Sequence, residues 1–218
     1  MPRSIPSDFA PLWEDLSSEV TWLVGRWQLY RELFLKSDVR VELLNAVDPA
    51  FFSVLQSILA DDAILGIARL MDPPGNPKQQ NSVLARLRLA PAIASDPALQ
   101  GEVQARLQSL DSLAEPIRLV RHKRLAHRDL NVALSQPGAG LPAVTISMIE
   151  EVVEKVTSLM NTIQVHFTGM ETGYSRGIWG LDAGGMIASL RAGLAYEDAS
   201  SNGLIPWDHI DKSPFRDA

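Results

Sequence analysis

Arginines and histidines gather in one short stretch of the chain, in types and at spacings that suit phosphate chemistry. We term residues 117–129 the basic segment. It contains one carboxylate and seven basic side chains: Arg118, Arg121, His122, Lys123, Arg124, His127 and Arg128. The planar guanidinium of arginine matches a phosphate with two parallel hydrogen bonds. Histidine, with an ordinary pKa of about 6.5, can both accept and donate protons near neutral pH. The segment therefore combines the side chains that metal-independent cleavage of RNA requires.

Such cleavage needs a base for the 2′-hydroxyl, an acid for the leaving 5′-oxygen and fixed positive charge for the phosphorane. Arg121 and His127 can supply these groups, but on an unbroken helix their side chains lie roughly 120° apart around the axis. Either the helix is distorted here, or a second copy of the chain supplies complementary groups across a two-fold axis. A structural interpretation competes, because basic residues near a helix C-terminus complement the helix dipole and usually form a solvated face.

A metal centre or cofactor site is not expected. The chain contains no cysteine, which excludes thiolate zinc sites, iron–sulfur clusters, disulfides and thiol nucleophiles. His122 and His127 are five residues apart, whereas two ligands on one helical face are three or four apart. Glycine pairs in the chain do not form a phosphate loop between a strand and a helix. Any catalysis is therefore expected to rely on side chains alone.

Carboxylates elsewhere give weaker candidates for chemistry. Arg69 and Asp72 are three residues apart, and we expect them to form an ion pair at a helix end. Asp61 and Asp62 lie within an apolar stretch, where they could reach the cleft as a carboxylate pair. Adjacent helical residues point about 100° apart, however, so we interpret these two as one polar edge.

The elements that must position these residues are helical. Period-two alternation is nowhere sustained, and a proline that follows aspartate predicts helix starts at residues 48–49 and 96–97. Ser147 and Glu150 have the spacing of a capping box, and Pro116 either kinks its helix or starts a new one. The sequence predicts an all-α protein, an antiparallel helical bundle of about five to six helices. Apolar residues recur three and four apart in four long stretches: residues 12–34, 51–70, 99–110 and 149–167.

The composition changes toward the C-terminus, where eight of the 14 glycines lie at or beyond Gly169. We predict a helical bundle over residues 7–168, and an appendage with one helix and a tail over residues 169–218. The chain of 218 residues has a net charge of −6, so a site for nucleic acid must be local. It shows no signal peptide and no stretch of the roughly 20 apolar residues that a membrane span needs, which predicts a cytoplasmic protein without a membrane partner.

Three segments together resemble the abortive-infection U-type branch of the HEPN superfamily, the higher-eukaryote and prokaryote nucleotide-binding domains. They are ARLMDP at residues 68–73, RHKRLAHRD at residues 121–129 and AGGMIASLR at residues 183–191. The second contains an arginine, a polar residue directly after it, and an Ala-His pair at its end. Position 122 departs from the family, which often has asparagine or aspartate where this chain has histidine. Histidine is polar as well, so the departure bears on rate more than on identity.

The resemblance implies a metal-independent endoribonuclease, commonly a homodimer whose arginines and histidines face one cleft. Arg121 would bind the phosphate, His127 would act as general acid or base, and His122 would support them. The other basic residues of the segment would bind RNA. Superfamily members are often toxins or phage-defence effectors, some with an antitoxin or a nucleotidyltransferase as partner. The alternatives are a catalytically inactive dimeric module that binds nucleotide, RNA or a protein, and a structural bundle unrelated to RNA.

Overall fold

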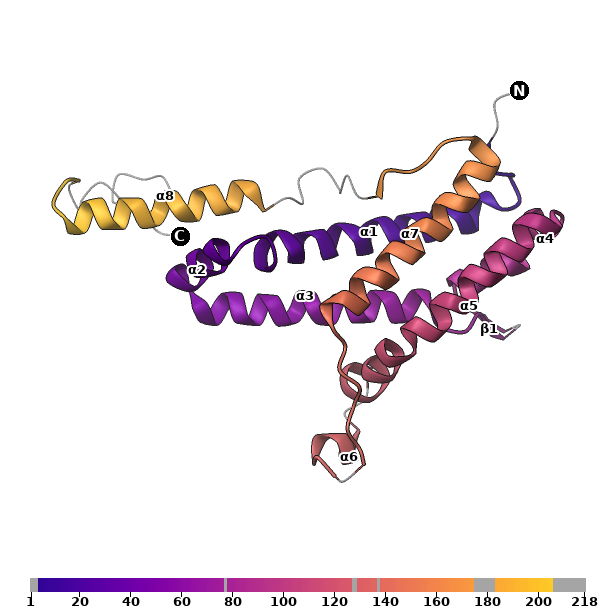
Figure 1. Cartoon of the computed structure of the whole chain (residues 1–218), viewed down its shortest axis with the longest axis horizontal. Helices are drawn as coiled ribbons and strands as arrows, with labels where there is room; N and C mark the ends of the chain where they lie inside the picture. Colours follow the sequence, from indigo (N-terminus) through magenta and orange to yellow (C-terminus); the bar gives the residue numbers. More distant parts are fainter. Residues whose placement is uncertain (1–3, 77, 127–128, 137, 175–182, 206–218) are drawn as a thin grey trace. The chain divides into compact units, whose positions relative to one another are not determined.

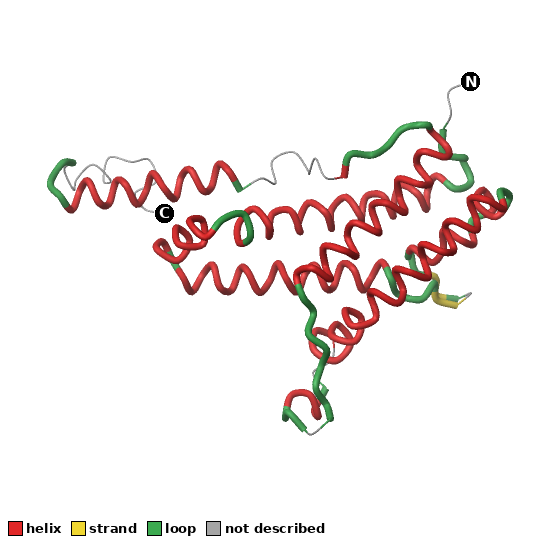
Figure 2. The backbone as a smooth tube through the Cα atoms, in the orientation of Figure 1, coloured by secondary structure: helices red, strands yellow, loops and turns green. Residues whose placement is uncertain are grey.

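The computed structural model describes residues 4–76, 78–126, 129–136, 138–174 and 183–205, and most of these residues are helical (Figures 1 and 2). The all-α prediction is therefore confirmed. The contacts divide the chain into two compact units. The first, termed the bundle unit, comprises residues 1–28 and 58–181, and the second comprises residues 29–57 and 182–218. The division at residue 169 that the glycine content suggested stays a prediction.

The helices and strands follow one another along the chain, with α1 and α3 running through both units. In chain order they are α1 (Ala10–Phe34), α2 (Asp38–Val47), α3 (Pro49–Leu70), β1 (Gly75–Asn76), β2 (Gln79–Gln80), the 3₁₀-helix η1 (Leu84–Leu89), α4 (Pro91–Ala94), α5 (Pro97–Val120), the π-helix η2 (Arg121–Ala126), α6 (Leu130–Ala133), α7 (Ile146–Thr168) and α8 (Gly184–Ser201).

In the bundle unit, α5 and α7 pack side by side along their apolar faces (Figure 1). Arg106 of α5 donates to Ser158 Oγ of α7 at 2.9 Å, and Asp96 lies 3.7 Å from His166, so the two helices run antiparallel. Each face repeats at intervals of three and four residues, which buries one stripe of the helix. The buried residues are Leu99, Val103, Leu107, Leu110, Ala114, Ile117 and Val120 on α5, and Ile149, Val152, Val153, Val156, Leu159, Met160 and Ile163 on α7.

The parts of α1 and α3 that belong to the bundle unit also run antiparallel. Arg26 Nε lies 2.8 Å from Asp62 Oδ2, and two turns along both helices Arg69 Nη2 lies 3.7 Å from Glu19 Oε2. The residue number falls along α1 as it rises along α3, which fixes both the direction and the register of the pair. This pairing carries the C-terminal end of α3 toward the elements that hold the basic segment.

Helix α3 contains a window with a mean hydropathy of 1.5 that is long and apolar enough to cross a membrane by length and composition. This differs from the expectation that no stretch of the chain approaches such a span. Core helices of globular proteins pass the same test, although 28% of this window is buried here. Asp61 and Asp62 lie in α3, and both pair with arginines of the bundle unit. Carboxylates of this kind are costly in hydrocarbon.

The starts of the helices follow local capping chemistry, with one shift from the prediction. Asp96 caps α5 as expected, its Oδ1 accepting from Ala98 N at 2.9 Å. The capping box predicted at Ser147 is wrong, because Thr145 caps α7 and accepts from Met148 N at 3.2 Å. Thr145 is also a preferred capping residue, and its use adds two residues to the helix.

Two short elements replace predicted ones. Residues 75–80, expected to be a polar loop at 76–80, include the antiparallel strand pair β1–β2. Residues 84–89, within the short helix expected at 82–90, form a 3₁₀-helix. In the second unit α2 and α8 pack against each other, and Glu32 accepts from both Lys36 and Arg40 near the end of α1.

Candidate active site in the basic segment

The basic segment begins at the end of a long helix whose geometry then changes. Helix α5 continues through Pro116 to Val120, so the proline does not start a new helix. From Arg121 to Ala126 the chain forms a π-helix, in which hydrogen bonds span five residues instead of four. A wider turn follows, since Asp129 N donates to Lys123 O at 3.1 Å. The helix is therefore distorted from Arg121 onward. The alternative that a second copy of the chain supplies complementary groups stays a prediction.

Arg121 is held by a carboxylate from a distant part of the sequence. Its Nη2 donates to Asp72 Oδ2 at 3.2 Å, and the two side chains are 29% and 27% exposed. The predicted pair of Arg69 with Asp72 is wrong, because Arg69 approaches Glu19 instead. The cause is local: α3 ends at Leu70, and the chain then turns, which takes Asp72 off the face that carries Arg69. The turn thus allows Asp72 to pair with Arg121, directly after α5.

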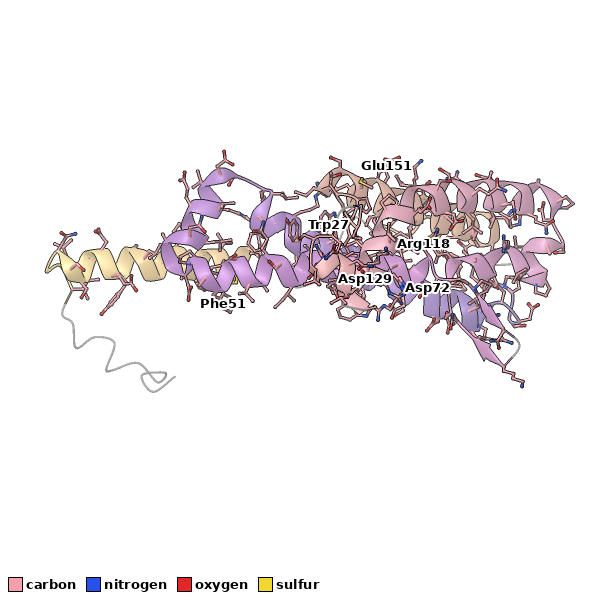
Figure 3. The ribbon with its side chains drawn as sticks, turned by 90° about the horizontal axis from the view of Figure 1, so that it is seen from below. Trp27, Phe51, Asp72, Arg118, Asp129 and Glu151 are labelled. Atoms are coloured by element: carbon pink, nitrogen blue, oxygen red, sulfur yellow. The ribbon has the colours of Figure 1, made fainter. Side chains whose placement is uncertain are left out.

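Two further arginines of the segment have aspartate partners. Arg118 Nη1 donates to Asp111 Oδ1 at 2.6 Å and to Met71 O at 3.2 Å. Arg124 pairs with Asp61, so the interpretation of Asp61 as part of a polar edge was incomplete. The segment has one carboxylate in sequence, yet three carboxylates from outside it compensate its charge in space. Figure 3 labels Asp72 and Arg118, which line one cavity of the bundle unit.

The structure describes two of the four remaining predicted residues. His122 is exposed on the π-helix. Lys123 is half-buried, and its side chain has no ion-pair or hydrogen-bond partner among the described residues. His127 and Arg128 lie outside the described residues. The structure therefore brings Arg118, Arg121 and Arg124 to one end of α5, each next to an acid.

Sequence reasoning missed Asp111, and it gave Asp72 and Asp61 other roles, a pair with Arg69 and a polar edge. A signal existed for Asp72, because it belongs to the ARLMDP segment that carried part of the resemblance. No local pattern marks Asp61 or Asp111, which reach their arginines only through packing. The three acids hold the guanidinium groups in place without removing them from solvent.

The pairs at Arg121 and Arg124 suit a site where a phosphate enters. Arg124 and Asp61 are 52% and 40% exposed, and an exposed ion pair contributes only about 0–1 kcal/mol. A phosphate of an RNA chain carries one negative charge shared by two oxygens, which match the guanidinium fork and can compete with a carboxylate. Within the described ranges, no group of three His, Asp or Glu side chains is arranged to hold a metal ion. Among the described residues, the site is thus a set of restrained guanidinium groups beside His122.

Comparison with known proteins gives one result. The family model HEPN_AbiU2, described as AbiU2, matches residues 7–178. That match includes all of the basic segment and the aspartates that pair with it. Searches of curated proteins and of solved structures found no match.

Proposed function

Because the chain belongs to the AbiU2 family of HEPN proteins, we propose that it is a metal-independent endoribonuclease that acts as a toxin or phage-defence effector. The observation that carries the proposal is the π-helix at Arg121–Ala126, which interrupts the helix at the Arg-His motif. Turns of this kind are rare and occur frequently at functional sites. It coincides with Arg121, which is oriented by Asp72 and remains accessible to a phosphate.

The proposed reaction is an internal transfer at phosphorus. One imidazole removes the proton from the ribose 2′-hydroxyl, and the 2′-oxygen attacks the adjacent phosphate. The 5′-oxygen leaves and takes a proton from a second, protonated imidazole. Arg121 stabilises the extra negative charge of the phosphorane. The products carry a 2′,3′-cyclic phosphate and a 5′-hydroxyl, and His127 is the imidazole assigned to these proton transfers.

We infer that the complete site belongs to a homodimer. One copy supplies a single His127, whereas the reaction uses a base and an acid at the same time. Across a two-fold axis, His127 of one copy would act as base while the other acts as acid. His122 supports the arginines as the polar residue of the motif, and Arg118, Lys123, Arg124 and Arg128 contact flanking phosphates. A monomer by light scattering at micromolar concentration would refute this arrangement.

A second function rests on one specific observation, the aspartate partners of Arg118, Arg121 and Arg124. Ion pairs of this kind also serve structural purposes, and they would suit a catalytically inactive module that binds nucleotide, RNA or a protein such as an antitoxin or a nucleotidyltransferase. Catalysis separates the two functions, because only an enzyme loses turnover when the imidazole is removed.

The test is cleavage of a structured RNA in EDTA by the wild type and by His127→Ala. EDTA inactivates contaminating nucleases that require a metal ion. His166→Ala is the matched control, since His166 is an exposed histidine on α7 outside the basic segment. We expect cyclic phosphate ends from the wild type and from the control, and none from His127→Ala. Equal cleavage by all three proteins would refute the assignment, and RNA binding without cleavage in all three would favour the inactive module.

A further inference from the structure

A cavity of about 270 Å³ opens beside the basic segment, within the bundle unit. Helix α5, η1 and the turn after α3 enclose it. Its apolar walls include Leu107 and two consecutive prolines, Pro73 and Pro74. Six polar or charged side chains also line it: Asp72, Arg88, Gln104, Gln108, Asp111 and Arg118. The cavity thus combines flat apolar surface with hydrogen-bonding groups.

Two glutamine side chains of this lining make no hydrogen bond within the described part of the chain. Gln104 and Gln108 are four residues apart on α5 and therefore share one face of the helix. Within the described part of the chain, neither side-chain amide has a hydrogen-bond partner. Each amide offers two N–H donors and a carbonyl acceptor. Such side chains pair with the edges of nucleic-acid bases, which carry donors and acceptors next to one another.

The charged groups that line the cavity balance one another in number. Arg88 and Arg118 bring two positive charges, and Asp72 and Asp111 bring two negative ones. Arg118 is further held by Met71 O and by Asp111, so its planar guanidinium has a fixed position against which a ring can stack. Asp111 is paired with Arg118 and Asp72 with Arg121, so an uncharged aromatic heterocycle can enter without replacing either ion pair.

The cavity is joined to the proposed phosphate site through one residue. Asp72 lines the cavity and at the same time accepts from Arg121 Nη2 at 3.2 Å. A phosphate on Arg121 would therefore lie next to the cavity, which is the arrangement that one nucleotide needs for its base and its phosphate. The volume is slightly below the roughly 300 Å³ at which pockets for drug-sized ligands begin, which suits one base rather than a larger molecule.

We propose that this cavity binds the base of a nucleotide whose phosphate is held by Arg121, with Gln104 and Gln108 reading the base edge. The proposal deepens the proposed function and rests on it for the assignment of that nucleotide to an RNA chain. The shared chemistry is a base attached to a sugar phosphate, which an RNA chain or a free nucleotide can supply. It makes the cavity the source of base preference at the cleavage site.

The test measures binding of AMP, CMP, GMP and UMP to the full-length protein by isothermal titration calorimetry. Ribose 5-phosphate, which lacks a base, is the reference ligand. We compare the wild type with the double variant Gln104→Met/Gln108→Met, which keeps the side-chain length. Gln100→Met is the matched control, because Gln100 is an exposed glutamine on α5 that does not line the cavity.

We expect the wild type and the control to bind at least one nucleotide more tightly than ribose 5-phosphate. The double variant should bind that nucleotide about two- to tenfold more weakly for each hydrogen bond lost. Its affinity for ribose 5-phosphate should not change. Equal affinity for ribose 5-phosphate and all four nucleotides would overturn the proposal, and so would an unchanged base preference in the double variant.

Two further measurements identify the source of the ligand and test the ribonuclease proposal separately. A pentanucleotide RNA that displaces the bound monophosphate assigns the cavity to an RNA chain, and one that does not displace it assigns the cavity to a free nucleotide. Base-dependent binding without RNA cleavage would refute the ribonuclease and keep the cavity assignment. If the protein cleaves RNA but its affinity for nucleotides does not depend on the base, only the cavity assignment is refuted.

Discussion

The substitution Asp72→Asn tests whether the aspartate at Arg121 orients that arginine for phosphate chemistry. The asparagine keeps the shape of the side chain and an oxygen that can accept from Arg121, but it removes the charge. At 3.2 Å the direct attraction between the two charges is about 5 kcal/mol at an effective dielectric constant of about 20. Desolvation and side-chain entropy offset most of it, because ion pairs at the surface contribute about 0–1 kcal/mol in total.

We therefore expect Asp72→Asn to lower the free energy of unfolding by about 0.5–1 kcal/mol, which lowers Tm by roughly 1–4 °C in a protein of this size. RNA should bind a few-fold more tightly, because one carboxylate no longer competes with phosphate for Arg121. The cleavage rate should fall about tenfold or more, because the guanidinium loses part of its orientation. Single-turnover cleavage and RNA titration measure the rate and the affinity separately.

The control for this substitution is Glu102→Gln on α5. Glu102 pairs with Arg106 at 2.8 Å, and the two side chains are 49% and 37% exposed, outside the basic segment. This variant should leave both RNA affinity and cleavage rate unchanged. The reasoning would be refuted if Asp72→Asn also left both unchanged, because Asp72 would then neither orient Arg121 nor compete with RNA.

Three further predictions concern the fold. Thr145→Ala should lower the free energy of unfolding by about 1 kcal/mol in urea titrations through loss of the α7 cap, whereas Ser147→Ala should change it little. The Lys36 hydrogen bond, aided by Arg40, lowers the pKa of Glu32 despite an opposing effect of burial. Its stabilisation is present above the unfolded-state pKa of 4.5 and is lost as pH falls through the folded-state pKa, so Glu32→Gln should reduce acid sensitivity in pH-dependent melts. Burial raises the pKa of Tyr174 above 10.0, so alkaline difference absorbance should show one late-ionising phenol that is missing in Tyr174→Phe.

The helices could be predicted from sequence wherever the signal is local. Asp96 and the proline that follows it fix the start of α5 within a few residues, because the cap and the fixed proline dihedral act over one turn. The apolar stripe of α7 identifies its buried face for the same reason. The cap at Thr145 was missed because two capping residues compete two positions apart, and the choice between them depends on how the whole helix packs.

The candidate site was only partly predictable, because its order arises from packing between distant segments. The Arg-His spacing in the sequence raised the question of whether the helix is distorted, and the π-helix at Arg121 answers it. Asp72 was assigned to Arg69 on the basis of helical spacing, which ceases to apply where α3 ends. Pairs such as Arg124 with Asp61 join residues far apart in sequence, and single-sequence periodicity carries no information about them.

The aspartate partners change what the basic segment can do. A cluster of unpaired arginines would attract any polyanion over long range, and its affinity would fall steeply with salt. Here Arg118, Arg121 and Arg124 each face a carboxylate, and the chain has a net charge of −6. On the proposed function, we therefore expect weak non-specific attraction to RNA, because a bound RNA has to replace each carboxylate with a phosphate. Selectivity among RNAs then depends on contacts beyond the phosphates, which is the role we assign to the cavity lined by Gln104 and Gln108.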